Sequence, residues 1–134
     1  MVYVLDTNIV IHYLRKEPNV RKNFRNAVMD NHDIIIPQVV DYEMERGFRI
    51  AFAPRKETNY KILVQNCKVA EMDVQSWKYA AHVYEDLHRK SFTVGEIDIL
   101  IAAFCLTNDY TLVTNNTKDF KHIRKLKLED WTQP

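Results

Sequence analysis

Glycine is nearly absent from this sequence, with Gly47 and Gly95 the only two in 134 residues. Phosphate-binding loops and the GxGxxG fingerprint need several closely spaced glycines, because the backbone must approach a phosphate closely. The scarcity of glycine therefore excludes P-loop and Rossmann-type cofactor binding. Cysteine is equally rare, and Cys67 and Cys105 show no Cys-x-x-Cys or Cys/His spacing. We expect two buried thiols and no zinc site or redox pair.

Long apolar runs are also missing. No run approaches the roughly 20 residues of a membrane span, and MVYVLD at the N-terminus lacks the basic head and cleavage site of a signal peptide. We expect a cytoplasmic protein with no membrane partner. A net charge of +1 does not by itself favour nucleic-acid binding, but the segment 118–127, KDFKHIRKLK, holds five Lys or Arg residues and one acid. We interpret this segment first as a solvent-exposed face of the protein, and contacts with nucleic-acid phosphates are the alternative.

What is present is the composition of a folded globular protein, with 46% hydrophobic and 28% charged residues. No Pro/Gly/Ser-rich linker or repeat divides the chain, so we expect one domain over residues 1–134. Short apolar runs alternate with longer segments of helical pattern, which predicts an α/β fold with a mostly parallel sheet covered on both faces. The expected strands are 2–6, 33–37, 67–73, 110–114 and one near 126–130. The first expected helix begins at Thr7 or Asn8. The other expected helices cover 19–30, 38–52, 56–66, 74–90 and 96–106.

Two acidic residues stand at positions that suggest a function. One follows a strand of the expected parallel sheet, and the other lies on the apolar side of an expected helix. Asp6 directly follows the first strand, and ligands bind at the carboxyl ends of such strands; a helix cap is its alternative role. Glu43 lies in the helical segment QVVDYEMERGFRI, on the side shared by Val39 and Gly47. An acid on this apolar side is poorly explained as a surface charge, although an ion pair remains open.

The stretch GEIDILIAAF places two acids before an apolar run. TVGE (93–96) matches a capping box, which predicts Thr93 as the N-cap and Glu96 as its partner. Asp98 then lies beyond the cap, on the face of Ile101 and Cys105. A helix beginning near Gly95 would instead place Asp98 in the first turn.

Asp6, Glu43 and Asp98 come from three separate segments and would repel one another if gathered without a cation. A hard divalent ion such as Mg²⁺ or Mn²⁺ prefers carboxylate and water oxygens and removes this objection. Activation of water for attack on a phosphodiester is the chemistry that such a site supports. The residues alone therefore point to a metal-dependent phosphoryl hydrolase.

Four motifs, VLDTNIVI, YEMERG, VGEIDILIAA and LVTNNTKDF, followed by LEDW, run in this order over the whole chain. Together they resemble the PIN-domain ribonuclease toxins of VapBC toxin–antitoxin modules. The resemblance implies a three-layer α/β/α sandwich that gathers acids around Mg²⁺ or Mn²⁺ and cuts RNA. Matched by motif, it assigns Asp6, Glu43 and Asp98 to the metal.

The fourth family position falls on Asn116, where many relatives have Asp. An amide orients water through a hydrogen bond but adds no charge, which leaves one or two metals open. Asp119 is a possible substitute carboxylate, with a first-turn helix acid as the alternative.

The resemblance also implies RNA and protein partners. It gives the basic run a role in RNA phosphate contacts, for which the candidates are Lys118, Lys121, Arg124 and Lys125. A tRNA, such as the initiator tRNA anticodon loop, is the expected substrate, with inhibition of translation as the result. A VapB-type antitoxin and a toxin homodimer are the expected partners, and the apolar residues proposed for these contacts are Tyr13, Val20, Phe24, Phe48 and Phe52.

Three other protein classes share some of these features. A HAD-like phosphatase needs Asp-x-Asp after the first strand, and Asn8 stands at the second position. A serine or cysteine hydrolase is not supported, because the sequence has no GxSxG and no histidine at triad spacing. A PIN domain that binds RNA or protein without cutting remains open, because Asn116 removes one acid from the family set.

Overall fold

A computed structural model describes residues 1–134 and contains one five-stranded sheet in the order β3-β2-β1-β4-β5. All four strand pairs are parallel. The predicted parallel sheet is confirmed, and each strand begins and ends within three residues of its expected range. The strands are β1 (Val2–Leu5), β2 (Asp33–Pro37), β3 (Lys68–Ala70), β4 (Thr111–Val113) and β5 (Lys127–Glu129).

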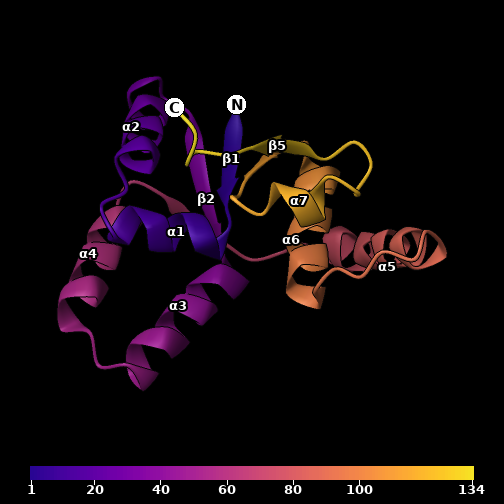
Figure 1. Ribbon diagram of the computed structural model, residues 1–134, viewed down its shortest axis with the longest axis horizontal. Coiled ribbons are helices and arrows are strands. Elements are labelled where there is room, and N and C mark those ends of the chain that lie inside the picture. The colour runs from indigo at the N-terminus through magenta and orange to yellow at the C-terminus, as the bar shows by residue number, and fades with distance from the viewer.

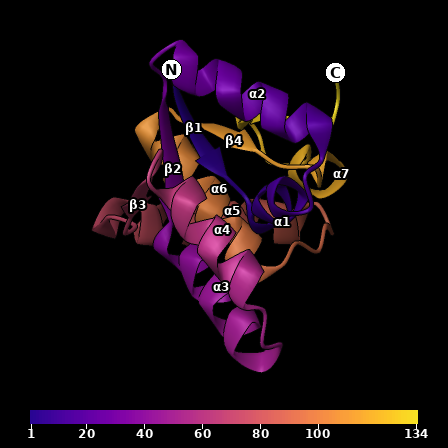
Figure 2. The same ribbon diagram turned by 90° about the vertical axis from the view of Figure 1, so that its left-hand side faces the viewer.

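Helices cover both faces of the sheet (Figures 1 and 2). The first four helices lie on one side of it, and α5 and α6 lie together on the other, which confirms the expected three-layer arrangement. The last helix, α7, is one short helical turn, in a segment, NNTKDF, whose polar residues predict a turn. The helices are α1 (Thr7–Leu14), α2 (Pro18–Met29), α3 (Gln38–Ile50), α4 (Pro54–Val64), α5 (Val74–Arg89), α6 (Glu96–Asn108) and α7 (Thr117–Phe120).

The order of the strands places a topological switch point between β1 and β4. From β1 the chain adds β2 and β3 on one side, and then crosses to add β4 and β5 on the other. Because crossovers between parallel strands are right-handed, this reversal puts the early helices and the α5–α6 pair on opposite faces. The crossovers leave in opposite directions at β1 and β4. In open parallel sheets ligands bind at such a point, outside the carboxyl ends of the strands.

The core is deepest around β1 and β4, the two strands on either side of this switch point. Val4, Leu5 and Val113 are at most 1% exposed, and in α6 Ile101 and Cys105 are fully buried. Helix α6 is apolar on almost every side, as expected of a helix enclosed by its neighbours. Its burial makes α6 a rigid support for the residues of its first turn. No helix is both long and apolar enough to cross a membrane.

Two of the five apolar residues proposed for partner contacts belong to the interior. Val20 is 1% exposed and Phe24 5%, and the Phe24 ring meets the rings of Tyr13 and Trp131 edge to face. For Val20 and Phe24 the surface prediction is wrong, because both are buried and Trp131 packs against Phe24. Phe52 differs, since 90% of it is exposed.

Candidate active site

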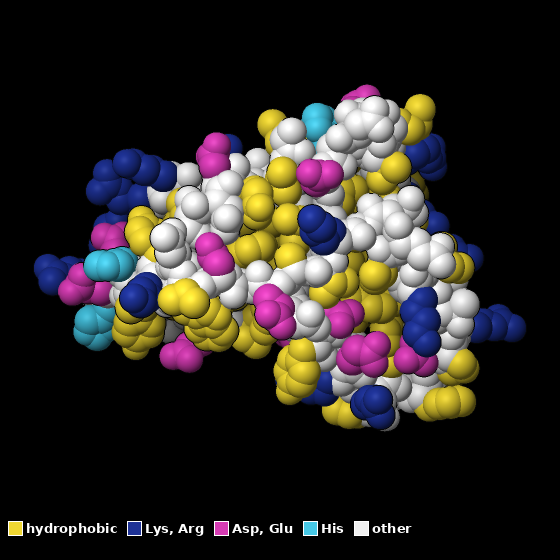
Figure 3. Space-filling view, turned by 180° about the vertical axis from the view of Figure 1, so that it is seen from behind, with side chains coloured by type: hydrophobic (Ala, Val, Ile, Leu, Met, Phe, Trp, Pro, Cys, Tyr) yellow, Lys and Arg dark blue, Asp and Glu magenta, His cyan; other side chains and the backbone are white.

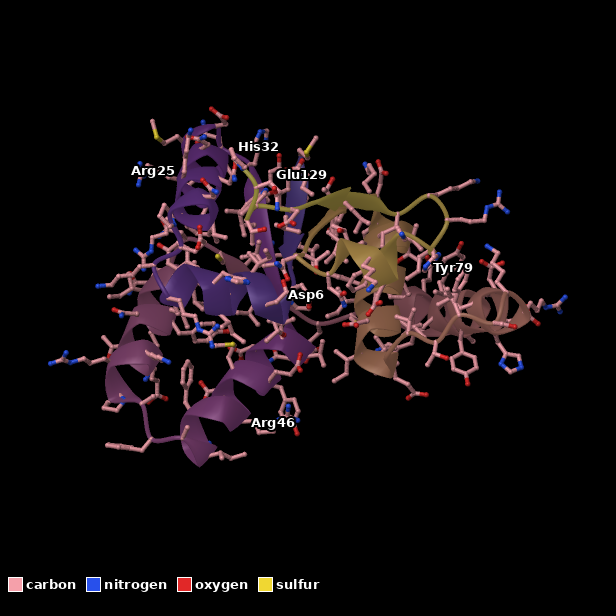
Figure 4. All side chains as sticks on the ribbon, in the orientation of Figure 1. Asp6, Arg25, His32, Arg46, Tyr79 and Glu129 are labelled. Carbon is pink, nitrogen blue, oxygen red and sulfur yellow. The ribbon has the colours of Figure 1, made fainter.

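Asp6 is the centre of the site and the most buried of its acids. It follows β1 directly, is 5% exposed, and lies between α1, α3 and α6 (Figure 4). One carboxylate oxygen accepts a hydrogen bond from the backbone N–H of Thr7 at 2.8 Å, so Asp6 caps α1. Capping occupies one oxygen and leaves the other directed toward the loop after β4.

A hydrogen-bond network fixes that second oxygen. It accepts from Thr114 Oγ1 at 2.9 Å and from Asn8 Nδ2 at 3.2 Å. Thr114 Oγ1 in turn accepts from the backbone N–H of Asn116 at 3.0 Å, and Asn8 Oδ1 accepts from that of Asn115 at 3.0 Å. The ends of β1 and β4 are therefore held together through polar side chains. Sequence reasoning gave Asn8 and Thr114 no role, although both stand at strand ends within the motifs quoted above.

Glu43 reaches the same region from the second turn of α3. Thr7 Oγ1 donates to Glu43 Oε1 at 2.8 Å, and the Glu43 side chain is 22% exposed. Its other oxygen lies 4.0 Å from Arg46 Nη2, a contact that solvent weakens because the Arg46 side chain is half exposed. Arg46 also lies over the ring of Tyr42, 5.3 Å from its centroid. Glu43 is thus oriented by Thr7 from α1 and only loosely paired with a cation.

Asp98 comes from the first turn of α6, and the predicted capping box does not form. The N-cap is Gly95, whose carbonyl accepts from the Ile99 N–H at 3.0 Å, and no side chain caps the helix. Glu96 is therefore the first helical residue and is exposed. Asp98 accepts no hydrogen bond. Since every buried polar side-chain atom in the structure has a partner, the Asp98 oxygens are open to solvent.

Burial and neighbouring negative charge raise the pKa of Asp98 and of Asp6. Partial burial, followed by repulsion from Asp6, Asp119 and Glu43, raises the pKa of Asp98 to about 6. Burial is also the main cause of the raised pKa of Asp6, and Glu43 adds to it, while hydrogen bonds from Thr114, Thr7 and Asn8 act in the opposite direction. A helix N-terminus favours a carboxylate, but at Asp98 burial and neighbouring charges outweigh it. The site gathers negative charge that only the loose contact between Glu43 and Arg46 offsets.

This donor set fits a hard divalent cation. Carboxylate oxygens are what Mg²⁺ and Mn²⁺ prefer, and a cation offsets the repulsion that the raised pKa values of Asp6 and Asp98 report. No three Asp, Glu, His or Cys side chains converge on one point as metal ligands do. An ion held here by one or two of the carboxylates would keep water in the rest of its shell, as Mg²⁺ usually does.

Asn116 and Asp119 lie at the same edge, next to α7. Asn116 is the N-cap position of α7, and its Nδ2 donates to Asp119 Oδ2 at 3.1 Å. Asp119 is near enough to Asp98 to raise its pKa. The amide at the fourth family position is thus paired with a carboxylate one turn later, and the first-turn role of Asp119 does not exclude a place at the site.

The basic run divides into two places. Lys118 and Lys121 are exposed on and just after α7, beside Asn116 and Asp119. Arg124 and Lys125 lie farther along and line a hollow of about 270 Å³ against α5. The structure therefore places only the first two of the four candidate RNA contacts next to the acids.

Comparison with known proteins agrees with this arrangement. Residues 3–126 match the PIN domain family. The chain is 31% identical to a protein named ribonuclease VapC2 from Rickettsia felis, over 98% of both chains. It is 26% identical to a tRNA(fMet)-specific endonuclease VapC from Salmonella typhimurium, over 96% of this chain and 97% of that one.

Among solved structures, VapBC2 from Rickettsia felis bound to a promoter DNA fragment is similar, with a TM-score of 0.90 at 28% identity over 98% of this chain and 99% of the matched chain. A family match over most of the chain and a full-length relative therefore agree. The chain belongs to the PIN domain family, as a member of the VapC type.

Proposed function

We propose that this protein is the endoribonuclease toxin of a type II toxin–antitoxin module, and that its activity depends on Mg²⁺ or Mn²⁺. One observation carries the proposal. Asp6, Glu43 and Asp98 come from three separate elements, Thr7 bonds to both Asp6 and Glu43, and Asp98, whose pKa is raised by burial and by these two charges, has no donor of its own. The ribonuclease names of its full-length relatives support the reaction class.

The proposed roles follow from these contacts. Asp6, Glu43 and Asp98 hold the ion, and Asn116 orients water or substrate through its amide. Asp119 supplies the carboxylate that position 116 lacks. The ion, when bound, supplies positive charge that activates water and offsets charge on the phosphate. Thr7 and Thr114 hold Glu43 and Asp6 in place through the hydrogen bonds described above.

A tRNA is the proposed substrate, with the initiator tRNA anticodon loop as the first candidate and inhibition of translation as the result. The Salmonella typhimurium relative is named for cleavage of tRNA(fMet), and it aligns over 96% of this chain. We propose that Lys118 and Lys121, which are exposed near Asp119, contact RNA phosphates, and that Arg124 and Lys125 do so only where the RNA extends toward α5.

The proposed partners are a VapB-type antitoxin and a second copy of the toxin. The similar structures from Rickettsia felis and Salmonella typhimurium are VapBC assemblies, both bound to DNA. We propose a toxin–antitoxin hetero-oligomer built on a toxin homodimer, in which the antitoxin blocks the site.

Purified protein, free of antitoxin, tests the function when it is incubated with total tRNA in Mg²⁺, in Mn²⁺ or in EDTA. We expect discrete cleavage with either metal and none in EDTA, and a loss of at least 100-fold for Asp98→Asn. Glu96→Gln is the matched control, because Glu96 is exposed at the start of the same helix. Equal cleavage by wild type and Asp98→Asn would contradict the catalytic assignment.

The alternative is a PIN domain that binds RNA or protein without cutting it. Asn116 in place of an acid and the unconverged carboxylates are the observations in its favour. Wild-type protein that binds tRNA but cleaves none of it in either metal would support this alternative.

A further inference from the structure

Two stacked rings lie on the segments that lead to the site acids. The rings of Phe92 and His122 are parallel to within 15°, with centroids 3.7 Å apart. Phe92 belongs to the loop that enters α6, whose first turn carries Asp98. His122 follows α7, which carries Asp119. Figure 1 shows this loop and α7 on the same side of the molecule. The stack therefore joins two segments that each bring a carboxylate to the site.

The backbone holds Phe92 in place although its ring is not part of the core. Ser91 has a left-handed conformation, with φ of 63°, and the Phe92 N–H donates to the Leu87 carbonyl at 2.9 Å. This is a Schellman-type end to α5, which fixes the position of the next side chain. Phe92 nevertheless remains 39% exposed. An aromatic ring held in place but left partly in water is available to a ligand.

A hollow lies beside Phe92. It has a volume of about 90 Å³, and its lining includes Tyr84, His88 and Thr93 but not His122. The rings of Tyr84 and His88 are themselves stacked, at 6.2 Å and 9°. Phe92 therefore lies between the ring of His122 and a hollow that the Tyr84–His88 pair also lines.

The charge beside the stack suits a nucleotide. Lys118 and Lys121 are exposed on the neighbouring turn and suit phosphate groups. Unpaired bases of RNA are recognised mainly by stacking on aromatic side chains, and every base has a face that can stack. A base inside a duplex offers no free face.

We propose that Phe92, backed by His122, stacks on an unpaired base of the RNA near the bond that is cut. The inference rests on the proposed ribonuclease function, because it takes RNA as the ligand. It also gives that function a preference, since a cleavage site with an unpaired neighbouring base is favoured over the same site in a duplex.

Binding to a single-stranded oligoribonucleotide that contains 2-aminopurine tests the proposal without requiring cleavage. The Asp98→Asn protein in Mg²⁺ serves as the parent. We expect its binding to quench the 2-aminopurine fluorescence, as stacking does, and to leave the same probe in a duplex unaffected. We expect Phe92→Leu to weaken binding about tenfold and to abolish the quench, and Phe92→Trp to restore both. Phe52→Leu is the matched control, because Phe52 is exposed on a different part of the surface.

The outcomes separate the two proposals. No quench with the parent, or equal affinity of the parent and Phe92→Leu, would overturn the stacking role even if wild type cleaves tRNA. Quenching that depends on Phe92, in a protein whose wild type cleaves nothing, would overturn the ribonuclease function and leave the stacking role standing. Thermal unfolding shows whether each Phe92 variant is folded. The quench measured with the Asp98→Asn parent, which keeps Phe92, tests the proposal even if a Phe92 variant fails to fold.

Discussion

At the scale of single residues, the site is a place where the fold accepts a cost in stability. Asp98 is half-buried, accepts no hydrogen bond and faces three other acids. Asp6 is more buried, but three donors offset part of its cost. Structural acids are usually paired, so an acid left in this state indicates a site shaped for a ligand.

Replacing Asp98 by Asn should therefore stabilise the metal-free protein. The pKa of Asp98 is raised to about 6 in the folded protein, from an ordinary value of 3.8. The charged form thus costs stability above pH 6, and this cost disappears as the pH falls through 6 toward 4. Because water screens a half-buried carboxylate, we expect a gain of about 1 kcal/mol at pH 7.5. Thermal unfolding in EDTA measures it.

The pH series supplies the control for this prediction. The difference in unfolding free energy between wild type and Asp98→Asn should shrink between pH 6 and pH 4, since the wild-type carboxyl then becomes neutral. In excess Mn²⁺ the order should reverse, because only the wild type gains stability from the bound ion. A variant less stable than wild type in EDTA at pH 7.5 would show that Asp98 has a structural partner.

At the scale of elements, the two glycines occupy helix positions at which alanine should have opposite effects on stability. Gly47 lies inside α3, and a Cβ added there would meet no atom within 4 Å. Gly95 is the N-cap of α6, where an added Cβ would lie 3.8 Å from Asp98 Oδ2. Neither has a positive φ. Neither glycine is required by the fold for conformational reasons, and Gly47 leaves space in a hollow of about 250 Å³ that Glu43 also lines.

Gly47→Ala should accordingly raise the free energy of unfolding. Alanine favours a helix interior over glycine by about 0.5–1 kcal/mol, which corresponds to a rise of roughly 2–4 °C in the melting temperature of a chain of this size. Gly95→Ala should have the opposite sign and cost a few tenths of a kcal/mol or more, since alanine is a poor N-cap. Calorimetry of both variants measures the pair, and a lower melting temperature for Gly47→Ala would show that the space beside it is filled.

The beginning of α6 shows where sequence patterns reach their limit. The strands and most helix boundaries followed from apolar periodicity and prolines, and the positions of Asp6 and Glu43 followed from the same patterns. The pattern TVGE predicted a helix beginning after Thr93, yet Val94 is buried and the chain stays extended through Gly95. Burial of one side chain overrode a local capping preference, and no local pattern contains that contact.

At the scale of the whole molecule, long-range contacts decide which surfaces remain free. The chain alone did not reveal that Trp131 covers Phe24, because they are far apart in sequence. It also did not reveal that one basic run would bend, so that its two halves face different neighbours. Figure 3 shows most Lys and Arg side chains of the rear face toward its margins and one near its middle, with apolar side chains between them and Asp and Glu side chains below. We therefore expect the contribution of a Lys or Arg residue to RNA binding to depend on its position relative to the acids more than on its membership of the basic run.

The bend predicts an unequal contribution of the four basic residues to RNA binding. In the Asp98→Asn background, Lys118→Gln with Lys121→Gln should reduce the salt dependence of binding to a single-stranded oligoribonucleotide by about 1.4 in the log–log slope, at about 0.7 for each lost phosphate contact. Arg124→Gln with Lys125→Gln removes the same charge from the hollow against α5 and should leave the slope nearly unchanged. Fluorescence anisotropy from 50 to 300 mM salt compares the pairs. Equal reductions would mean that RNA passes over both halves of the run, as its sequence alone suggests.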